Sequence, residues 1–221
     1  HDLRNPLTAI YGAFSFLDEI VSPTLPPATL ELWNVARNST NGMLAMVNEI
    51  LDISRLESNQ MPVDKTLVAL RPLVEEVLGS QMPLAVQKEI RLDNAVEASL
   101  PPVWADEGLV GRVLRNLVGN AVKFTPEGGT VTVSARLGDD GQRVVVFVKD
   151  TGSGIPPKIR SQLFRRFVTG DQQERGSGLG LAFCKMAIEA HGEHLWVEDT
   201  SPAGTTFAFT LPLFHKATER S

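Results

Sequence analysis

Two glycine-rich turns and one polar helix face hold the residues that could do chemistry in this chain. The first turn, Asp150 to Ile155, follows a predicted strand, and the second, Gly176 to Leu181, precedes a predicted helix. A glycine-rich turn that opens a helix presents free backbone N–H groups, which suit phosphate oxygens. Neither turn has the Gly-Lys-Ser/Thr ending of a Walker A loop or the strand–turn–helix setting of a dinucleotide-binding turn. Each turn by itself is therefore compatible with phosphate binding and with an ordinary reversal of the chain.

The polar helix face lies just before the first turn. Asn116, Asn120 and Lys123 are spaced by four and three residues, which places them on one side of a helix. Amide oxygens and a positive charge suit a hydrated magnesium ion and the phosphates that it bridges. A solvated helix face would show the same spacing, so the face indicates a metal–phosphate site only together with the glycine turns.

The elements that must position these groups differ along the chain. Apolar residues near the N-terminus alternate spacings of four and three and predict a heptad-like helix stripe: Leu3, Leu7, Ile10, Phe14, Leu17 and Val21. Three prolines between Ser22 and Pro27 end this helix, and a second helix is predicted from Ala28 to about Leu56. A hairpin of two such helices leaves an apolar face uncovered, which a second copy would cover in a four-helix bundle.

From Met61 onward, helix and strand patterns mix. We expect helices over residues 70–87, from a cap at Asp106 to Phe124, and over 179–190. Pro83 should kink or end the first of these, because an interior proline costs a helix about 3 kcal/mol. The predicted strands are 130–136 and 143–149, which form a hairpin, and 195–198 and 205–211.

Composition excludes several classes of protein. The chain has 221 residues, of which 43% are hydrophobic and 21% charged, so it has enough apolar side chains for a core. A single cysteine, Cys184, excludes an intramolecular disulfide framework, and a net charge of -5 argues against broad nucleic-acid binding. The longest apolar run, Val144 to Val148, is far too short to span a membrane. We expect a cytoplasmic fragment of a longer protein, without direct membrane contact.

The motifs together resemble the sensor histidine kinases of two-component signalling. Their sequence boxes are matched in order by residues 115–126 (N box), 150–155 (first glycine box), 163–167 (F box), 176–181 (second glycine box) and 204–207 (closing Gly-Thr element). His1 to Leu7, HDLRNPL, resembles the H box that carries the phosphorylated histidine, and Leu51 to Glu57 resembles the end of the second bundle helix. The resemblance covers nearly the whole chain.

This resemblance implies an α+β protein with two domains. Residues 1–60 would be the dimerisation and histidine phosphotransfer domain, a two-helix hairpin that forms a four-helix bundle in a homodimer. Residues 61–221 would be the catalytic ATP-binding domain, a Bergerat-type α/β sandwich with three helices on a mixed sheet. ATP and Mg²⁺ are the implied ligands, and the receiver domain of a response regulator is the implied partner.

The resemblance also assigns roles to residues. Asp150 would accept a hydrogen bond from the exocyclic amine of adenine, and Asn120 would coordinate the metal. The nucleotide-binding positions carried over are Asn116, Asn120, Lys123, Asp150, Gly152, Gly154, Ile155, Phe167, Gly176, Ser177, Gly178, Leu179, Gly180 and Thr206. His1 would be the phosphoacceptor, with Asp2 as its neighbouring general base. Asn5, one helical turn on, would position water for dephosphorylation of the receiver.

One departure leaves alternatives open. After the F box, where the family often has an aromatic residue and then an arginine, this chain has Val168 and Thr169. Contact with the terminal phosphate would then fall to Arg165, Arg166 or Arg175. A plain ATPase of the same fold and a catalytically inactive scaffold are the rival readings; the H box argues against the first, and only the missing arginine favours the second.

Overall fold

The computed structural model describes residues 4–21, 25–58, 62–168 and 177–214, without the side chains of residues 4, 5 and 18–21. It divides into two compact units, His1–Arg55 and Leu56–Ser221. The boundary predicted after residue 60 lies outside the described residues, a few positions beyond this division. Within the described residues, no helix combines the length and apolar character that a membrane span requires.

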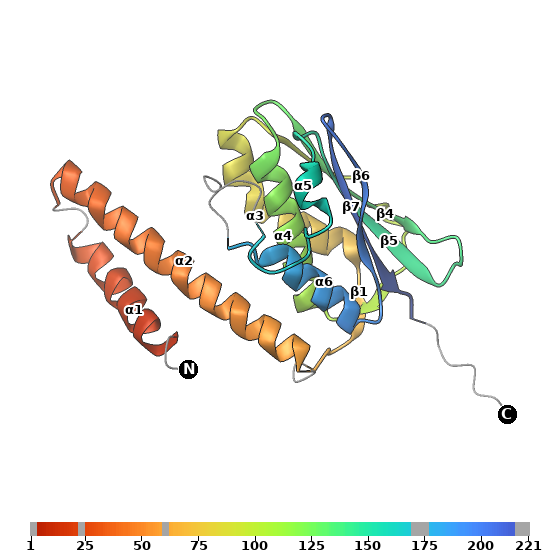
Figure 1. The fold of residues 1–221 in the computed structure, drawn as a ribbon, viewed down its shortest axis with the longest axis horizontal. Helices are drawn as coiled ribbons and strands as arrows, with labels where there is room; N and C mark the ends of the chain where they lie inside the picture. Colours follow the sequence, from red (N-terminus) through yellow and green to blue (C-terminus); the bar gives the residue numbers. More distant parts are fainter. Residues whose placement is uncertain (1–3, 22–24, 59–61, 169–176, 215–221) are drawn as a thin grey trace. The chain divides into compact units, whose positions relative to one another are not determined.

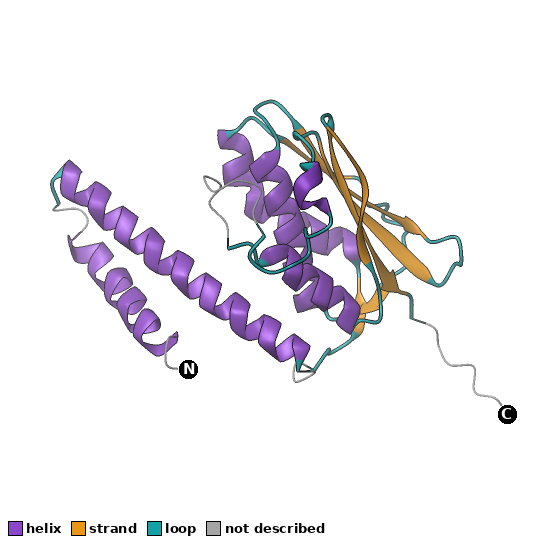
Figure 2. Ribbon diagram, viewed as in Figure 1, coloured by secondary structure: helices purple, strands orange, loops and turns teal. Residues whose placement is uncertain are grey.

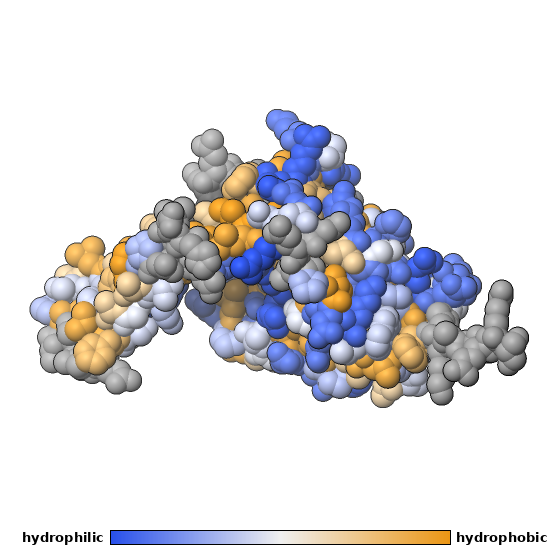
Figure 3. Space-filling model, turned by 90° about the horizontal axis from the view of Figure 1, so that it is seen from below, coloured by the Kyte–Doolittle hydropathy of each residue, from blue (hydrophilic) through white to orange (hydrophobic). Residues whose placement is uncertain are grey.

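The N-terminal unit is a hairpin of two helices, as predicted. Helix α1 (Arg4–Val21) and helix α2 (Pro27–Glu57) run side by side (Figure 1). Phe14 and Trp33 join them by an edge-on ring contact, with 4.8 Å between the ring centroids. Many other apolar side chains of this unit stay exposed, and several are visible at the left of Figure 3. They are Ile10, Tyr11, Phe16, Leu17, Leu32, Val35, Met43, Met46 and Ile50.

The second unit is built on a five-stranded sheet with the strand order β2-β4-β5-β7-β6. Its strands are β2 (Arg91–Asn94), β4 (Thr130–Leu137), β5 (Arg143–Asp150), β6 (Leu195–Ser201) and β7 (Gly204–Pro212). Strand β2 pairs with β4 in parallel, and the remaining pairs are antiparallel, including the expected β4–β5 hairpin. A separate pair of short strands, β1 (Thr66–Val68) and β3 (Val103–Ala105), lies antiparallel.

Three helices cover one face of this sheet (Figure 2). They are α3 (Leu70–Gln87), α4 (Glu107–Phe124) and α6 (Gly180–Ala190); a further short helix, α5 (Pro157–Arg160), follows the first glycine box. The core between the layers is formed by alternate residues of β5, such as Val146, and by α4 residues such as Leu114 and Leu117, all fully buried. This two-layer arrangement confirms the α/β sandwich.

Two expectations about helix ends had different outcomes. Asp106 caps α4 as predicted, since its Oδ1 accepts a hydrogen bond of 2.9 Å from the N–H of Leu109. Helix α3 spans Leu70–Gln87, the predicted range, and runs through Pro83, so of the two expected effects of the proline the ending of the helix does not occur. The ring of Pro83 meets the carbonyl of Gly79, and Gly79 is exposed, so water can satisfy that carbonyl.

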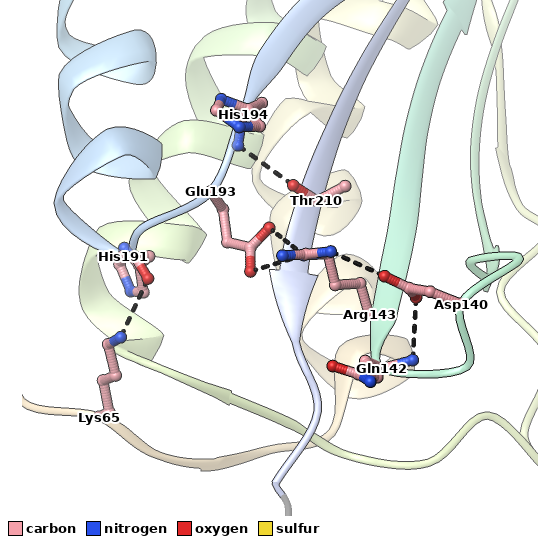
Figure 4. A network of polar contacts seen from close by, with 8 residues as sticks. All are labelled: Lys65, Asp140, Gln142, Arg143, His191, Glu193, His194 and Thr210. Atoms are coloured by element: carbon pink, nitrogen blue, oxygen red, sulfur yellow. Dashed lines mark hydrogen bonds and ion pairs between the residues drawn. The ribbon is translucent and has the colours of Figure 1, made fainter.

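A polar network joins the end of the sheet where β5 begins to the turn after α6 (Figure 4). The buried carboxylate of Glu193 pairs with Arg143 at 3.0 Å, and Arg143 also pairs with Asp140 at 2.7 Å. The Nε2 atom of His191 accepts a 3.0 Å hydrogen bond from the N–H of Asp106. The His191 ring therefore links the turn after α6 to the start of α4, which is a structural role.

Candidate nucleotide-binding site

Asp150, the last residue of β5, is a buried carboxylate at the end of the sheet away from the polar network. Its side chain is 6% exposed, yet no cation pairs with it among the described residues. Its Oδ1 atom accepts hydrogen bonds from the N–H of Gly152 at 2.8 Å and of Thr205 at 3.1 Å. Both bonds go to Oδ1, so the second oxygen, Oδ2, can accept a hydrogen bond from a ligand.

Burial raises the pKa of Asp150 above its ordinary value, and the two backbone hydrogen bonds oppose that shift. A carboxylate that is kept in a partly dehydrated place forms a strong hydrogen bond with an N–H donor. The residue is therefore suited to read the amine edge of a base.

The backbone that follows Asp150 is packed so closely that only glycine fits at two of its positions. A Cβ atom at Gly152 would lie 2.7 Å from the carbonyl oxygen of Phe124 and 2.8 Å from the Asp150 carboxylate. Gly154 has a positive φ of 76°, and a Cβ there would collide with the backbone of Ser201. The next N–H, of Ile155, donates to the hydroxyl of Thr200 at 2.9 Å. The first glycine box is thus held between the end of α4 and the end of β6.

The two threonines of the closing Gly-Thr element lie on opposite faces of the sheet. Thr206 pairs with the exposed Lys149, the neighbour of Asp150 along β5, so it lies on the face opposite to Asp150. Thr205 is 5% exposed, donates its N–H to Asp150, and has its hydroxyl 3.3 Å from that of Thr200. The structure therefore does not bring Thr206 to the site that the resemblance implied, and it places Thr205 there instead. In a strand, residues two apart lie on one face, so Thr205 shares the face of the apolar Phe207. That alternation was the signal in the sequence that favoured Thr205.

The second glycine box is fastened to the F box. The N–H of Phe167 donates to the carbonyl of Gly178 at 2.9 Å, and a Cβ at Gly178 would lie only 2.7 Å from the Cα of Phe167. Both residues have positive φ, 60° and 66° respectively. Ser177 accepts the N–H of Leu179, which is buried. Gly176 lies outside the described residues. These contacts hold the end of the F box against the second glycine box.

Helix α4 connects the two glycine boxes. Near its middle, the Asn116 amide is 3.5 Å from the carbonyl of Gly180, the first residue of α6. At its end, the carbonyl of Phe124 packs on Gly152. With a rise of 1.5 Å per residue, the two contacts lie about 12 Å apart along the helix axis. A nucleotide with its base at Asp150 can therefore lie along α4 with its phosphates toward the second box.

Asn120 and Lys123 lie on α4 between these contacts. The Asn120 side chain is half-buried and makes no hydrogen bond to any described residue, while Lys123 is exposed. The described residues also contain no group of three or more His, Cys, Asp or Glu that could hold a metal. An amide oxygen completed by phosphate oxygens and water is a ligand set that fits Mg²⁺.

The proposed phosphotransfer residues are not part of the described structure. His1 and Asp2 lie outside the described residues, and so does the side chain of Asn5.

A contact that the sequence did not predict involves Lys88, whose ammonium group binds the carbonyl end of α4. Its partners lie 34 to 37 residues away, and no local pattern could reveal them.

Comparison with known proteins agrees with this site. The family described as "Histidine kinase-, DNA gyrase B-, and HSP90-like ATPase" matches residues 105–215, and the "His Kinase A (phospho-acceptor) domain" matches residues 1–59. A buried carboxylate at the sheet end, two glycine boxes and the helix between them thus define an ATP-binding domain of the first family. With both domains present, the chain belongs to the sensor histidine kinases.

Individual relatives extend over the whole chain. It is 36% identical over 220 residues to the adaptive-response sensory kinase SasA of Gloeothece citriformis, covering 97% of this chain and 56% of that protein. A structure of full-length ShkA in complex with AMPPNP matches 98% of this chain and 45% of ShkA, with a TM-score of 0.84 and 32% identity. The histidine kinase ThkA in complex with the response regulator TrrA matches with a TM-score of 0.67 and 26% identity, over 97% of this chain and 59% of ThkA. The chain spans little more than half of the curated relatives that it matches.

Proposed function

We propose that the protein uses Mg-ATP to phosphorylate His1 and passes the phosphoryl group to an aspartate of a response regulator. The observation that carries the nucleotide part is the buried Asp150 carboxylate: both of its backbone hydrogen bonds go to Oδ1, so Oδ2 is left to accept from a ligand. The match of residues 1–59 to the phosphoacceptor domain supports the histidine part. Residues 1–60 would then form the phosphotransfer domain and 61–221 the catalytic domain.

In this proposal, each part of the site binds one part of the nucleotide. Asp150 accepts the exocyclic amine of adenine, and Thr205, rather than Thr206, lies beside the base. Gly152, Gly154 and Ile155 let the backbone approach the base, while Asn116 and Lys123 face the phosphates. The second glycine box, from Gly176 to Gly180 with Ser177, Gly178 and Leu179, closes over the phosphate end together with Phe167. Asn120 would hold Mg²⁺, which would supply charge neutralisation on the phosphates.

The transfer itself needs mainly positioning and charge neutralisation. A neutral imidazole is abundant near pH 7, so His1 can attack the terminal phosphorus in line. A nitrogen–phosphorus bond forms as the bond from that phosphorus to the bridging oxygen breaks, and ADP leaves. Asp2 accepts the proton from the other ring nitrogen, an assistance of roughly 10²–10⁴-fold.

The partners follow from the same reaction. The exposed apolar side chains of α1 and α2 support a homodimer, in which a second copy covers them. ThkA in complex with its response regulator supports a receiver domain as the acceptor of the phosphoryl group. Because ATP is the donor, we place the reaction in the cytoplasm. Asn5 would position water for the reverse removal of phosphate from the receiver.

Incubation with labelled ATP tests this function against its rivals. A histidine kinase gives label on the protein that is acid-labile and base-stable, an ATPase gives only free phosphate, and a scaffold gives neither. Asn120→Asp places a fixed negative charge beside the phosphates, so we expect the labelling rate to fall at least about tenfold. Asn38→Asp, the same change at an exposed position of α2, is the control and should leave the rate within twofold. Equal rates for both variants would remove Asn120 from the site.

A further inference from the structure

Lys88 follows the last residue of α3 and makes an unusually complete set of contacts. Its Nζ atom donates to the carbonyl oxygens of Val122 at 2.8 Å, Lys123 at 2.9 Å and Thr125 at 2.7 Å. An ammonium group has three N–H donors, and all of them are used here. The side chain is half-buried, so these bonds are partly shielded from water.

The carbonyls that Lys88 binds belong to the end of α4 and to its C-cap. The last carbonyls of a helix have no partner within the helix, and the helix dipole makes this end negative. The positive charge of Lys88 compensates that end, and its donors satisfy these groups. Thr125 is fixed further by its own hydroxyl, which donates to the carbonyl of Ala121 at 2.6 Å.

The same helix end touches the candidate nucleotide site. Phe124 lies between the carbonyls that Lys88 binds, and its own carbonyl oxygen packs against Gly152 so closely that a Cβ would approach to 2.7 Å. Gly152 in turn donates its N–H to the Asp150 carboxylate. A shift of the α4 end therefore moves the backbone that orients Asp150.

We propose that Lys88 is a positioning residue for nucleotide binding: by gripping the carbonyl end of α4, it holds Phe124 against Gly152 and so orients the Asp150 carboxylate. The proposal rests on the function proposed for this site. Lys88 itself does not touch the nucleotide. Its loss should therefore weaken binding of the base while the fold remains.

Lys65 provides a matched control. It is also half-buried, and its Nζ donates to a backbone carbonyl, that of His191, at 3.0 Å, near the other end of the domain. Lys88→Met and Lys65→Met each remove one charge and keep an unbranched side chain. Both are compared with the full chain by melting temperature, by ADP affinity from calorimetry, and by the NMR signal of the Gly152 amide without nucleotide.

We expect Lys88→Met to raise the Kd for ADP roughly tenfold, and to shift the Gly152 amide signal and speed its hydrogen exchange. Lys65→Met should lower the melting temperature by a similar amount, yet leave the Kd within twofold and the Gly152 signal in place. Lys88→Arg, which keeps the charge but has a planar fork that cannot converge on the same carbonyls, should restore only part of the affinity.

Several outcomes would overturn the proposal. An unchanged Gly152 signal in folded Lys88→Met protein would show that the lysine is only a helix cap. A Kd that changes equally in both variants would show a general effect of stability. If the unmodified chain binds no ADP, the proposed function fails, whereas the Gly152 signal without nucleotide still tests whether Lys88 positions this turn. If Lys88→Met does not fold, a change in the Gly152 signal of Lys88→Arg decides for the proposal, and an unchanged signal decides against it.

Discussion

The two units of this chain treat their apolar side chains in opposite ways. In the helical hairpin, Phe16 and Leu32 are 72% and 71% exposed. In the α/β unit, Leu114 and Leu117 of α4 are fully buried between helix and sheet. Two helices have only one mutual contact surface, while a sheet covered by three helices encloses a core.

This difference separates what each unit can do alone. The α/β unit completes its own core, so its nucleotide site is defined by a single chain. The hairpin leaves enough apolar surface uncovered to indicate a partner, which we have proposed to be a second copy of the chain. Nucleotide binding should therefore be insensitive to association, and histidine phosphorylation should depend on it.

The largest expected effect breaks the association and leaves the α/β unit intact. Phe16→Glu puts a charge on the exposed face of α1 in both copies of the dimer. Each lost phenylalanine contact is worth about 1.5–3 kcal/mol, so two of them should raise the dimer Kd about 100-fold or more. Light scattering should show a monomer, while ADP affinity stays within twofold.

Leu137→Glu is the matched control for this change. Leu137 is 46% exposed and lies at the end of β4 in the other unit, so the variant should remain a dimer. If the unmodified chain is a monomer, or if Phe16→Glu still dimerises, association through a four-helix bundle is wrong.

The next largest effect is the opposite case: it weakens nucleotide binding by the α/β unit and leaves dimerisation of the hairpin intact. Asp150→Asn keeps an oxygen for the N–H groups of Gly152 and Thr205 but replaces the second oxygen with a donor. Loss of a buried charge-assisted hydrogen bond should weaken ATP binding roughly 10- to 100-fold. The melting temperature should stay close to that of the parent, because removal of a buried charge offsets the weaker hydrogen bonds of the amide. The dimer should be unaffected.

Asp93→Asn, at an exposed position of β2, should leave ATP affinity unchanged in the same titration.

The pKa of Asp150 is raised by burial, so its carboxylate becomes protonated at a higher pH than that of an ordinary aspartate. Affinity should thus be full above that raised pKa and fall as pH drops through it. Unchanged affinity in the Asp150 variant would sink the adenine assignment.

A smaller effect concerns the hairpin alone. Asn5→Ala should leave phosphorylation of His1 within a few-fold, because Asn5 has no part in ATP binding. Removal of a group that positions water should slow dephosphorylation of the cognate receiver by roughly tenfold. The measurement follows the loss of label from phosphorylated receiver in the absence of ADP. Loss at the parental rate would restrict the protein to its kinase function.

The smallest effect is a pH dependence of folding stability that His191 should give to the α/β unit and not to the hairpin. Burial lowers the pKa of His191 below its ordinary 6.5, while its Nδ1 donates to the carbonyl of Ala187 at 2.7 Å and its Nε2 accepts from Asp106. The neutral ring therefore stabilises the fold fully above pH 6.5, and this contribution is lost as pH falls toward the lowered pKa.

His191→Gln keeps an acceptor but cannot titrate, so it should flatten this pH dependence. The expected change in slope is at most about 1.4 kcal/mol per pH unit, the limit for one proton. Chemical denaturation between pH 5 and 8, followed by a signal from the α/β unit, measures this slope. His194→Gln, at an exposed position, is the control. Identical slopes for the parent and the Gln variant would show that His191 is not buried in its neutral form.

The local patterns of the sequence determined most of the elements and their order. The spacing of apolar residues gave the two long helices, Asp106 gave the start of α4, and the alternation in 130–149 gave the β4–β5 hairpin, because each of these is set by neighbours in the chain. The glycine boxes were equally legible, since positive φ at Gly154 and Gly178 requires a residue without a side chain. Pro83 does not end α3, because the cost of an interior proline depends on whether water reaches the carbonyl four residues earlier, that of the exposed Gly79.

Only the tertiary structure decided which atoms meet at the site. Asp150 obtains its raised pKa from burial between strands and helix, and it receives the N–H of Thr205 from 55 positions further along the chain. Whether Thr205 or Thr206 lies beside Asp150 depends on the register of β7 against β5. The hydrogen bonds of Lys88 to the carbonyl end of α4 depend on how α3 packs against α4. Contacts between residues far apart in the chain leave no periodic signal, since their geometry is fixed only when the layers have assembled.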